Sequence, residues 1–137
     1  MVDRRLPRVQ EVLFPVLRAQ FPGVTFTSWY ADVDHRTYPF VNVRRLGGLS
    51  KDAKRLDKPV IEMTVYTRYG LVAAENLYLD VREVIWDMVR NQTVTPAGYL
   101  HSFFETMGPT PFDSGIDDTW RVQGLIQLGV RPPRLAA

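Results

Sequence analysis

Cysteine is absent from the 137 residues, and so are long apolar runs and a large excess of either charge. Without cysteine the chain has no disulfide, no thiolate nucleophile and no cysteine-ligated zinc or iron–sulfur centre. No segment approaches the roughly 20 apolar residues that a membrane-spanning helix needs, and the N-terminus lacks the apolar core of a signal peptide. The formal net charge of +2 does not by itself indicate nucleic-acid binding. We therefore expect a soluble protein with no membrane partner.

Histidine is also scarce, and no catalytic set gathers around the two that occur. His35 shares a polar turn with Asp32 and Asp34, which are ligand types that a metal site or a small enzyme site would use. A turn whose aspartates cap their own backbone explains these residues more simply. No serine lies in a nucleophile elbow, and no glycine-rich stretch matches a phosphate-binding loop. We predict no enzymatic activity, no metal and no cofactor.

Apolar residues, by contrast, are plentiful enough for one core. They make up 45% of the chain and include sixteen aromatic side chains. A chain of this length buries about 68% of its unfolded surface, which is enough for one domain without disulfides. We therefore expect a single domain over residues 1–137.

Two segments have the apolar period of amphipathic helices. Apolar residues recur at helical spacing over Leu6–Gln20, where Pro15 predicts a bend or a division into two short turns. The strongest helical pattern covers Leu71–Gln92, and Asn91 is placed to cap its C-terminus. Both helices would bury one apolar stripe against a sheet.

Five segments have the composition and alternation of strands. They are Val24–Tyr30, Phe40–Leu46, Pro59–Arg68, Tyr99–Met107 and Thr119–Arg131. For Tyr99–Met107 a short helix is the alternative. We expect the first two to form a hairpin. The predicted order is α-β-β-β-α-β-β, and the predicted fold class is α+β, an antiparallel-dominated β-sheet with two amphipathic helices packed on one face.

Two segments read as mobile loops, Gly47–Lys58 and Gly108–Asp118, and the tail Pro132–Ala137 reads as loose. The first loop and its approach are rich in basic side chains. They are Arg44, Arg45, Lys51, Lys54, Arg55 and Lys58. Such a loop either faces phosphates or an acidic partner, or is a solvated flexible segment.

Other features point to contacts between chains. The strand Pro59–Arg68 is apolar on both faces, and long strand edges pair with other chains unless they are covered. Four aromatic residues lie at the ends of predicted elements, where they suit either an interface or the rim of the core. They are Trp29, Tyr30, Trp86 and Tyr99.

The order of these elements resembles that of phage tail terminator proteins. The resemblance covers nearly the whole chain and is carried by four segments. They are the N-terminal helix (Leu6–Gln20), the strand running into a basic glycine-containing segment (YPFVNVRRLGG, Tyr38–Gly48), the strand feeding the long helix (Lys58–Val89), and the Gly-Pro segment leading to the last strand (Met107–Pro133).

This resemblance implies a structural subunit of a virion tail, assembled in the host cytoplasm, that forms a hexameric ring. The ring would cap the tail tube, join the tail to the head, contact tail-tube and head–tail connector proteins, and let genomic DNA pass through its channel. The basic segment would then face the lumen or a partner ring. The alternatives are a head-closure, adaptor or tail-tube subunit of the same machinery, or a small DNA-binding module that uses residues 44–58.

Overall fold

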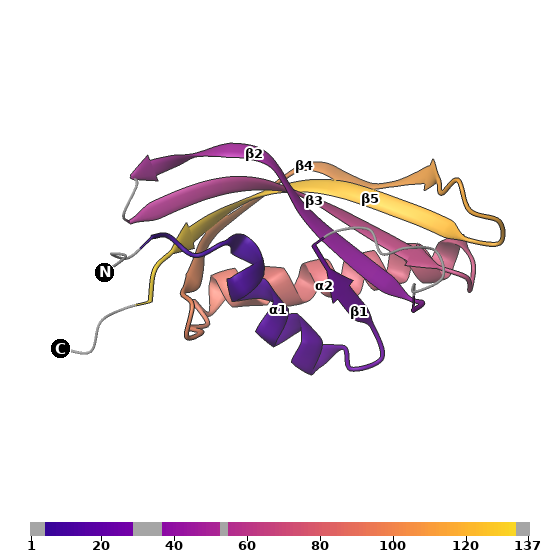
Figure 1. The fold of residues 1–137 in the computed structure, drawn as a ribbon, viewed down its shortest axis with the longest axis horizontal. Coiled ribbons are helices and arrows are strands. Elements are labelled where there is room, and N and C mark those ends of the chain that lie inside the picture. Colours follow the sequence, from indigo (N-terminus) through magenta and orange to yellow (C-terminus); the bar gives the residue numbers. More distant parts are fainter. Residues whose placement is uncertain (1–4, 29–36, 53–54, 134–137) are drawn as a thin grey trace.

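The computed structural model describes residues 5–28, 37–52 and 55–133, which form two helices and one five-stranded sheet (Figure 1). The elements in chain order are α1 (Val9–Gln20), β1 (Thr25–Thr27), β2 (Phe40–Asp52), β3 (Leu56–Thr67), α2 (Leu71–Arg90), β4 (Tyr99–Asp113) and β5 (Trp120–Arg131). This is the predicted order.

The strands lie in the order β1-β2-β3-β5-β4. Neighbouring strands are antiparallel except for β1 and β2. Both helices lie on the same side of this sheet (Figure 1). The predicted fold class, α+β with an antiparallel-dominated sheet covered on one face, is confirmed.

The core forms where the helices meet the middle strands. Ile61, Met63 and Val65 of β3 are fully buried. Helix α2 turns a stripe towards them at steps of three and four residues, as its sequence predicts. The stripe consists of Ala74, Tyr78, Val81, Ile85 and Met88. Burying each large apolar side chain contributes roughly 1.5–3 kcal/mol, so this layer is the main source of stability.

The ends of the two helices agree only in part with those predicted from the sequence. Asn91 caps α2 through its backbone N–H, which donates to the carbonyl of Asp87. Helix α1 begins at Val9 rather than Leu6 and continues through Pro15 to Gln20, so the alternative of two short turns is wrong. Pro15 lies on the solvent side, while Leu13 and Leu17 on either side of it are fully buried. Packing of that face offsets the hydrogen bond that proline removes.

The predicted hairpin between the first two strands is wrong. β1 pairs with β2 in parallel, with Thr25 opposite Phe40 and Thr27 opposite Asn42. The segment 28–39 supplies the dozen or so residues that a parallel connection needs. Most of it, together with the end of the predicted strand at Tyr30, lies outside the described residues.

The predicted loop at Gly47–Lys58 is also wrong, because most of it is strand. β2 runs on to Asp52, β3 starts at Leu56, and Leu49 lies opposite Lys58 in the ladder. The glycines mark irregularities of a hairpin rather than a loop. A side chain at Gly48, which has φ of 88°, would place its Cβ 2.1 Å from the carbonyl oxygen of Lys58.

The second predicted loop, Gly108–Asp118, is half strand. β4 continues to Asp113, and the register shifts between Met107 and Thr110. Pro109 and Pro111 are tolerated because β4 is an edge strand. None of the described helices is both long and apolar enough to cross a membrane.

Candidate functional site

The basic segment forms a projecting hairpin, residues 45–58, which we call the arm. Figure 1 shows its strands continuing beyond the end of the helical layer. Arg45 anchors its base. Its guanidinium donates to both carboxylate oxygens of Asp57, at 2.6 and 2.9 Å, and Asp57 is only 4% exposed. Arg44 similarly pairs with the buried Glu62 at 3.3 Å. Two of the six predicted basic residues therefore form ion pairs within the chain that stabilise the fold.

Among the other basic residues of the arm that the structure describes, Lys51 and Arg55 are exposed and Lys58 is half-buried. Within the described part of the chain, Lys51, Arg55 and Lys58 form no ion pair, while Lys54 lies outside that part. Leu49, between these cations, is 81% exposed. The arm therefore presents positive charge and one large apolar side chain to a partner.

Lys58 also marks where the arm joins the sheet. Desolvation lowers the pKa of His101 on β4, and the positive charges of Arg131 and Lys58 lower it further. His101 is therefore neutral at pH 7.

The four predicted interface aromatics separate into three cases. Trp29 and Tyr30 lie outside the described residues. Tyr99 is only 7% exposed, which favours its interpretation as a core residue. Trp86 is 38% exposed and meets Phe103 edge to face, with ring centroids 5.1 Å apart. Trp86 thus keeps its place as an interface candidate.

Trp86 lines a groove between α2 and the edge strand β4, which we call the aromatic groove. Its volume is about 410 Å³. Its lining consists of Arg82, Glu83, Trp86, Phe103, Phe104 and Glu105. Phe104 is 66% exposed, but it lies opposite Gln127 in the ladder and points to the face of the sheet away from α2. Phe103 and Phe104 were not among the predicted interface residues, because they lie inside a segment whose sequence resembles that of an ordinary strand.

A buried hydroxyl fixes α2 against the floor of this groove. Tyr78 donates a hydrogen bond to Glu105 at 3.3 Å, and Arg82 holds the same carboxylate at 3.0 and 3.2 Å. Burial raises the pKa of Tyr78, and the neighbouring Glu105 charge raises it further, so the phenol stays protonated as a donor. Gly124 makes room for it, because a Cβ there would lie 1.8 Å from the Tyr78 oxygen.

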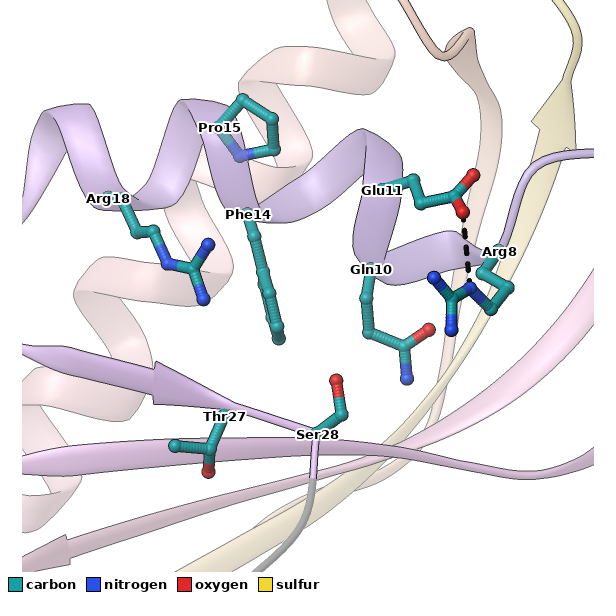
Figure 2. A pocket seen from close by; sticks show the side chains of 8 residues that line it. All are labelled: Arg8, Gln10, Glu11, Phe14, Pro15, Arg18, Thr27 and Ser28. Atoms are coloured by element: carbon teal, nitrogen blue, oxygen red, sulfur yellow. Dashed lines mark hydrogen bonds and ion pairs between the residues drawn. The ribbon is translucent and has the colours of Figure 1, made fainter.

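A second pocket, of about 470 Å³, lies between α1 and β1 (Figure 2). Its polar side chains are engaged with their surroundings. Arg8 pairs with Glu11 at 3.1 Å, and Arg18 donates to the carbonyl of Phe26 at 3.1 Å. Partial desolvation, which alone would raise the pKa of Glu11, is outweighed by hydrogen bonds from Arg5 and Arg8, so that pKa is lowered. A carboxylate held ionised in this way is a poor general acid.

Metal-binding clusters of side chains do not form in the described ranges. No three His, Asp or Glu side chains gather there as a metal site would require. The turn with Asp32, Asp34 and His35 lies outside them. Asp113 accepts a hydrogen bond from the backbone of Gly115, which is the ordinary use of aspartate in a turn.

Two long sheet edges complete the interaction surfaces. Over the described residues, β4 pairs only with β5, and β2 pairs beyond Asn42 only with β3. Both edges present backbone groups that another strand can pair with. A small domain with two free edges, a charged arm and an open apolar groove has the surfaces of an assembly subunit.

Comparison with known proteins agrees with that class. The chain belongs to the family described as phage tail termination protein, whose model matches residues 5–137. It is therefore a structural component of a phage tail, which confirms the predicted resemblance.

Two relatives cover almost the same length. The Gene 22 protein of Mycobacterium phage L5 is 54% identical over 95% of this chain and 96% of its own. The Gene 22 protein of Mycobacterium phage D29 is 50% identical over 94% of this chain and 96% of its own. A chain from the virion of a native gene transfer agent particle shares the fold, with a TM-score of 0.59 and 16% identity over 90% of this chain and 94% of that one.

Proposed function

We propose that copies of this chain form a closed hexameric ring that caps the tail tube and joins the tail to the head. The observation that carries this proposal is the family match over residues 5–137. The ring contacts the tail-tube protein on one side and head–tail connector proteins on the other, and genomic DNA passes through its channel. It is assembled in the host cytoplasm and has no enzymatic activity.

The two free sheet edges support a ring. An edge on β2 and a different edge on β4 are unlike surfaces, so a contact between them joins copies head to tail. Head-to-tail contacts close into a ring when the rotation between copies allows it. Each copy then covers an edge that would otherwise be exposed.

Loss of the gene product tests the proposal through the shape of the particles. We expect overlong tails and unjoined heads in electron micrographs, because nothing then stops growth of the tube. Heads that package DNA and leak it, beside tails of normal length, would instead identify a head-closure or adaptor subunit. Absence of tail tubes altogether would identify the tube subunit itself.

A DNA-binding module is the remaining alternative, and the ion pairs weigh against it. Arg44 and Arg45 are held by Glu62 and Asp57, which removes two of the six basic side chains from contact with phosphates. A gel-shift titration of the purified chain with duplex DNA at low salt separates the two ideas. Tight binding that weakens steeply with salt would favour the module.

A further inference from the structure

Both described helices lie on one side of the sheet, and we call the other side, which no described helix covers, the open face (Figure 1). Successive residues of a strand point to opposite faces of a sheet. On β5, Val122 and Val130 are buried in the core beneath the helices. Their neighbours Arg121 and Arg131 therefore point to the open face. One cation thus lies near each end of this strand.

Other segments add cations to the open face. On β3, Ile61 is buried in the core, so alternation turns Lys58 to the opposite side. The guanidinium of Arg68 lies 4.4 Å from the centre of the Tyr38 ring, which packs 5.3 Å from the ring of Phe40 on the open face. Within the described residues, Lys58, Arg68 and the two arginines of β5 form no ion pair.

Carboxylates are nearly absent from the same face. Glu62 is the one carboxylate of the described strands that points there from within a strand, and Arg44 pairs with it at 3.3 Å. The others point to the helical side or lie at a strand end. They are Asp52, Asp57, Glu105 and Asp113. The open face is therefore positive, and its four free cations need an anionic partner.

The dimensions of the open face suit duplex DNA. Strand β5 has 12 residues, so it is about 40 Å long at roughly 3.3 Å per residue. That length exceeds one turn of B-DNA, which is about 34 Å. Gln123 and Gln127 lie between the two arginines and add amide donors. Contacts from Arg, Lys and Gln to phosphate oxygens do not depend on sequence, which suits DNA that moves through a channel.

An acidic protein surface fits these cations less well. The acidic surface that another copy would offer is helix α2, but Arg90 already pairs with Glu83 and Asp87. The helix carboxylates that form no ion pair in the described structure are then Glu75 and Asp80. Duplex DNA carries about one negative charge per 1.7 Å of its axis. DNA therefore supplies the denser counter-charge.

We propose that the open face lines the channel of the ring and contacts the phosphate backbone of the DNA inside it, through Lys58, Arg68, Arg121 and Arg131. The inference rests on the proposed ring and names the surface that faces its channel. Each copy offers few cations, so one chain binds DNA weakly and the ring sums the contacts of its copies.

Cross-linking in particles filled with radiolabelled DNA tests the contact. Phe104 is 66% exposed on the open face, and Val72 on α2 is a matched control at 69%. Each is replaced in turn by the photoreactive residue p-benzoylphenylalanine, and irradiated particles are digested with nuclease. We expect at least tenfold more label on the chain from position 104 than from position 72. Circular dichroism checks folding, which exposed substitutions leave intact.

The outcomes separate the DNA contact from the ring. If glutaraldehyde gives multimers of the unmodified chain in particles but position 104 gives no more label than position 72, the open-face inference is wrong and the ring stands. A cross-link from position 104 to another protein chain in place of DNA would also overturn it. If glutaraldehyde gives no multimers, the ring itself is wrong, and label at position 104 would then favour the DNA-binding module.

A second measurement uses charge alone. Lys58→Gln with Arg131→Gln removes two cations from the open face, so we expect DNA to leave purified particles at least threefold faster at about 10 mM salt. The difference should vanish at 1 M salt, where the screening length is only about 3 Å. Arg8→Gln with Arg90→Gln removes the same charge from the helical side and should not change the rate. Equal rates for the two variants, or an acceleration that persists at 1 M salt, would contradict the inference.

Discussion

The strand pair β2–β3 is one continuous ladder with two very different halves. Around Met63 every residue of β3 from Ile61 to Thr67 is buried. The helices cover one face, and side chains of the neighbouring strands, including Phe40, Arg44 and Gln123, contact the other. Towards the arm, β2 is exposed from Arg45 to Asp52. Backbone pairing continues through both halves, although the ladder shifts register twice in the arm. Backbone hydrogen bonds and the Arg45–Asp57 ion pair therefore hold the arm together, while burial of apolar side chains stabilises mainly the body.

The largest change in stability is expected from a substitution in the body, the buried half of the β2–β3 strand pair. Met63→Ala removes fully buried side-chain volume and should lower the free energy of unfolding by about 2–5 kcal/mol. Leu49→Ala, the matched change on the arm, should alter it by no more than about 0.5 kcal/mol. Urea denaturation followed by tryptophan fluorescence measures both. Equal losses would show that the arm packs against its own chain.

The next effect is at the contact between Tyr78 and Gly124. Gly124→Ala brings a Cβ into the space of the phenol, so we expect destabilisation of about 1–3 kcal/mol from overpacking. Adding Tyr78→Phe removes the oxygen that clashes and should recover part of that loss. A thermal-unfolding double-mutant cycle measures the coupling. Strictly additive losses would exclude the contact.

A smaller effect concerns the anchor of the arm. Asp57→Asn leaves Arg45 without its carboxylate, and we expect a loss of about 1–2 kcal/mol, since the guanidinium is partly solvated. Hydrogen exchange should speed up in residues 45–58 and stay unchanged at Ile61 and Val65. Uniform acceleration over both halves would mean that arm and body open together.

The smallest effect is a pH dependence at His101 on β4, whose pKa the charge of Lys58 in the arm helps to lower. The folded pKa of His101 is below its ordinary value, so the unfolded chain binds more protons as the pH falls through about 6.5. Stability contributed by this residue is present above that pH and is lost below it. His101→Gln should flatten the melting temperature between pH 7.5 and pH 5.5. An NMR titration giving an ordinary pKa would contradict this.

The sequence alone predicted those elements whose apolar pattern matches the side chains that they bury in the structure. The period of Leu71–Gln92 placed α2 to within two residues, and alternation located β3 and β5. The arm was missed because Gly47 and Gly48 read as loop residues, whereas in the structure they accommodate bulges and a close backbone approach. A local sequence pattern does not indicate which strand will pair with a given segment.

The candidate surfaces were predictable only in outline. The basic segment was recognised, but the pairing of Arg45 with Asp57 depends on the strand register and could not be read from spacing. The exposure of Phe104 could not be predicted for a similar reason. Whether a strand residue faces solvent or core depends on the strand pairing, which only the fold defines. The parallel pairing of β1 depends on a connection that no local signal describes.

The prolines of β4 affect whether copies of the chain can polymerise through this edge of the sheet. On the strand whose outer side has no partner within the described chain, Pro109 and Pro111 lack backbone donors, and register shifts break the spacing of the others. An incoming strand finds regular spacing only along Ser102–Glu105. Such an edge resists open-ended polymerisation into fibres, a useful property in a protein whose family is named for bringing a tail to an end.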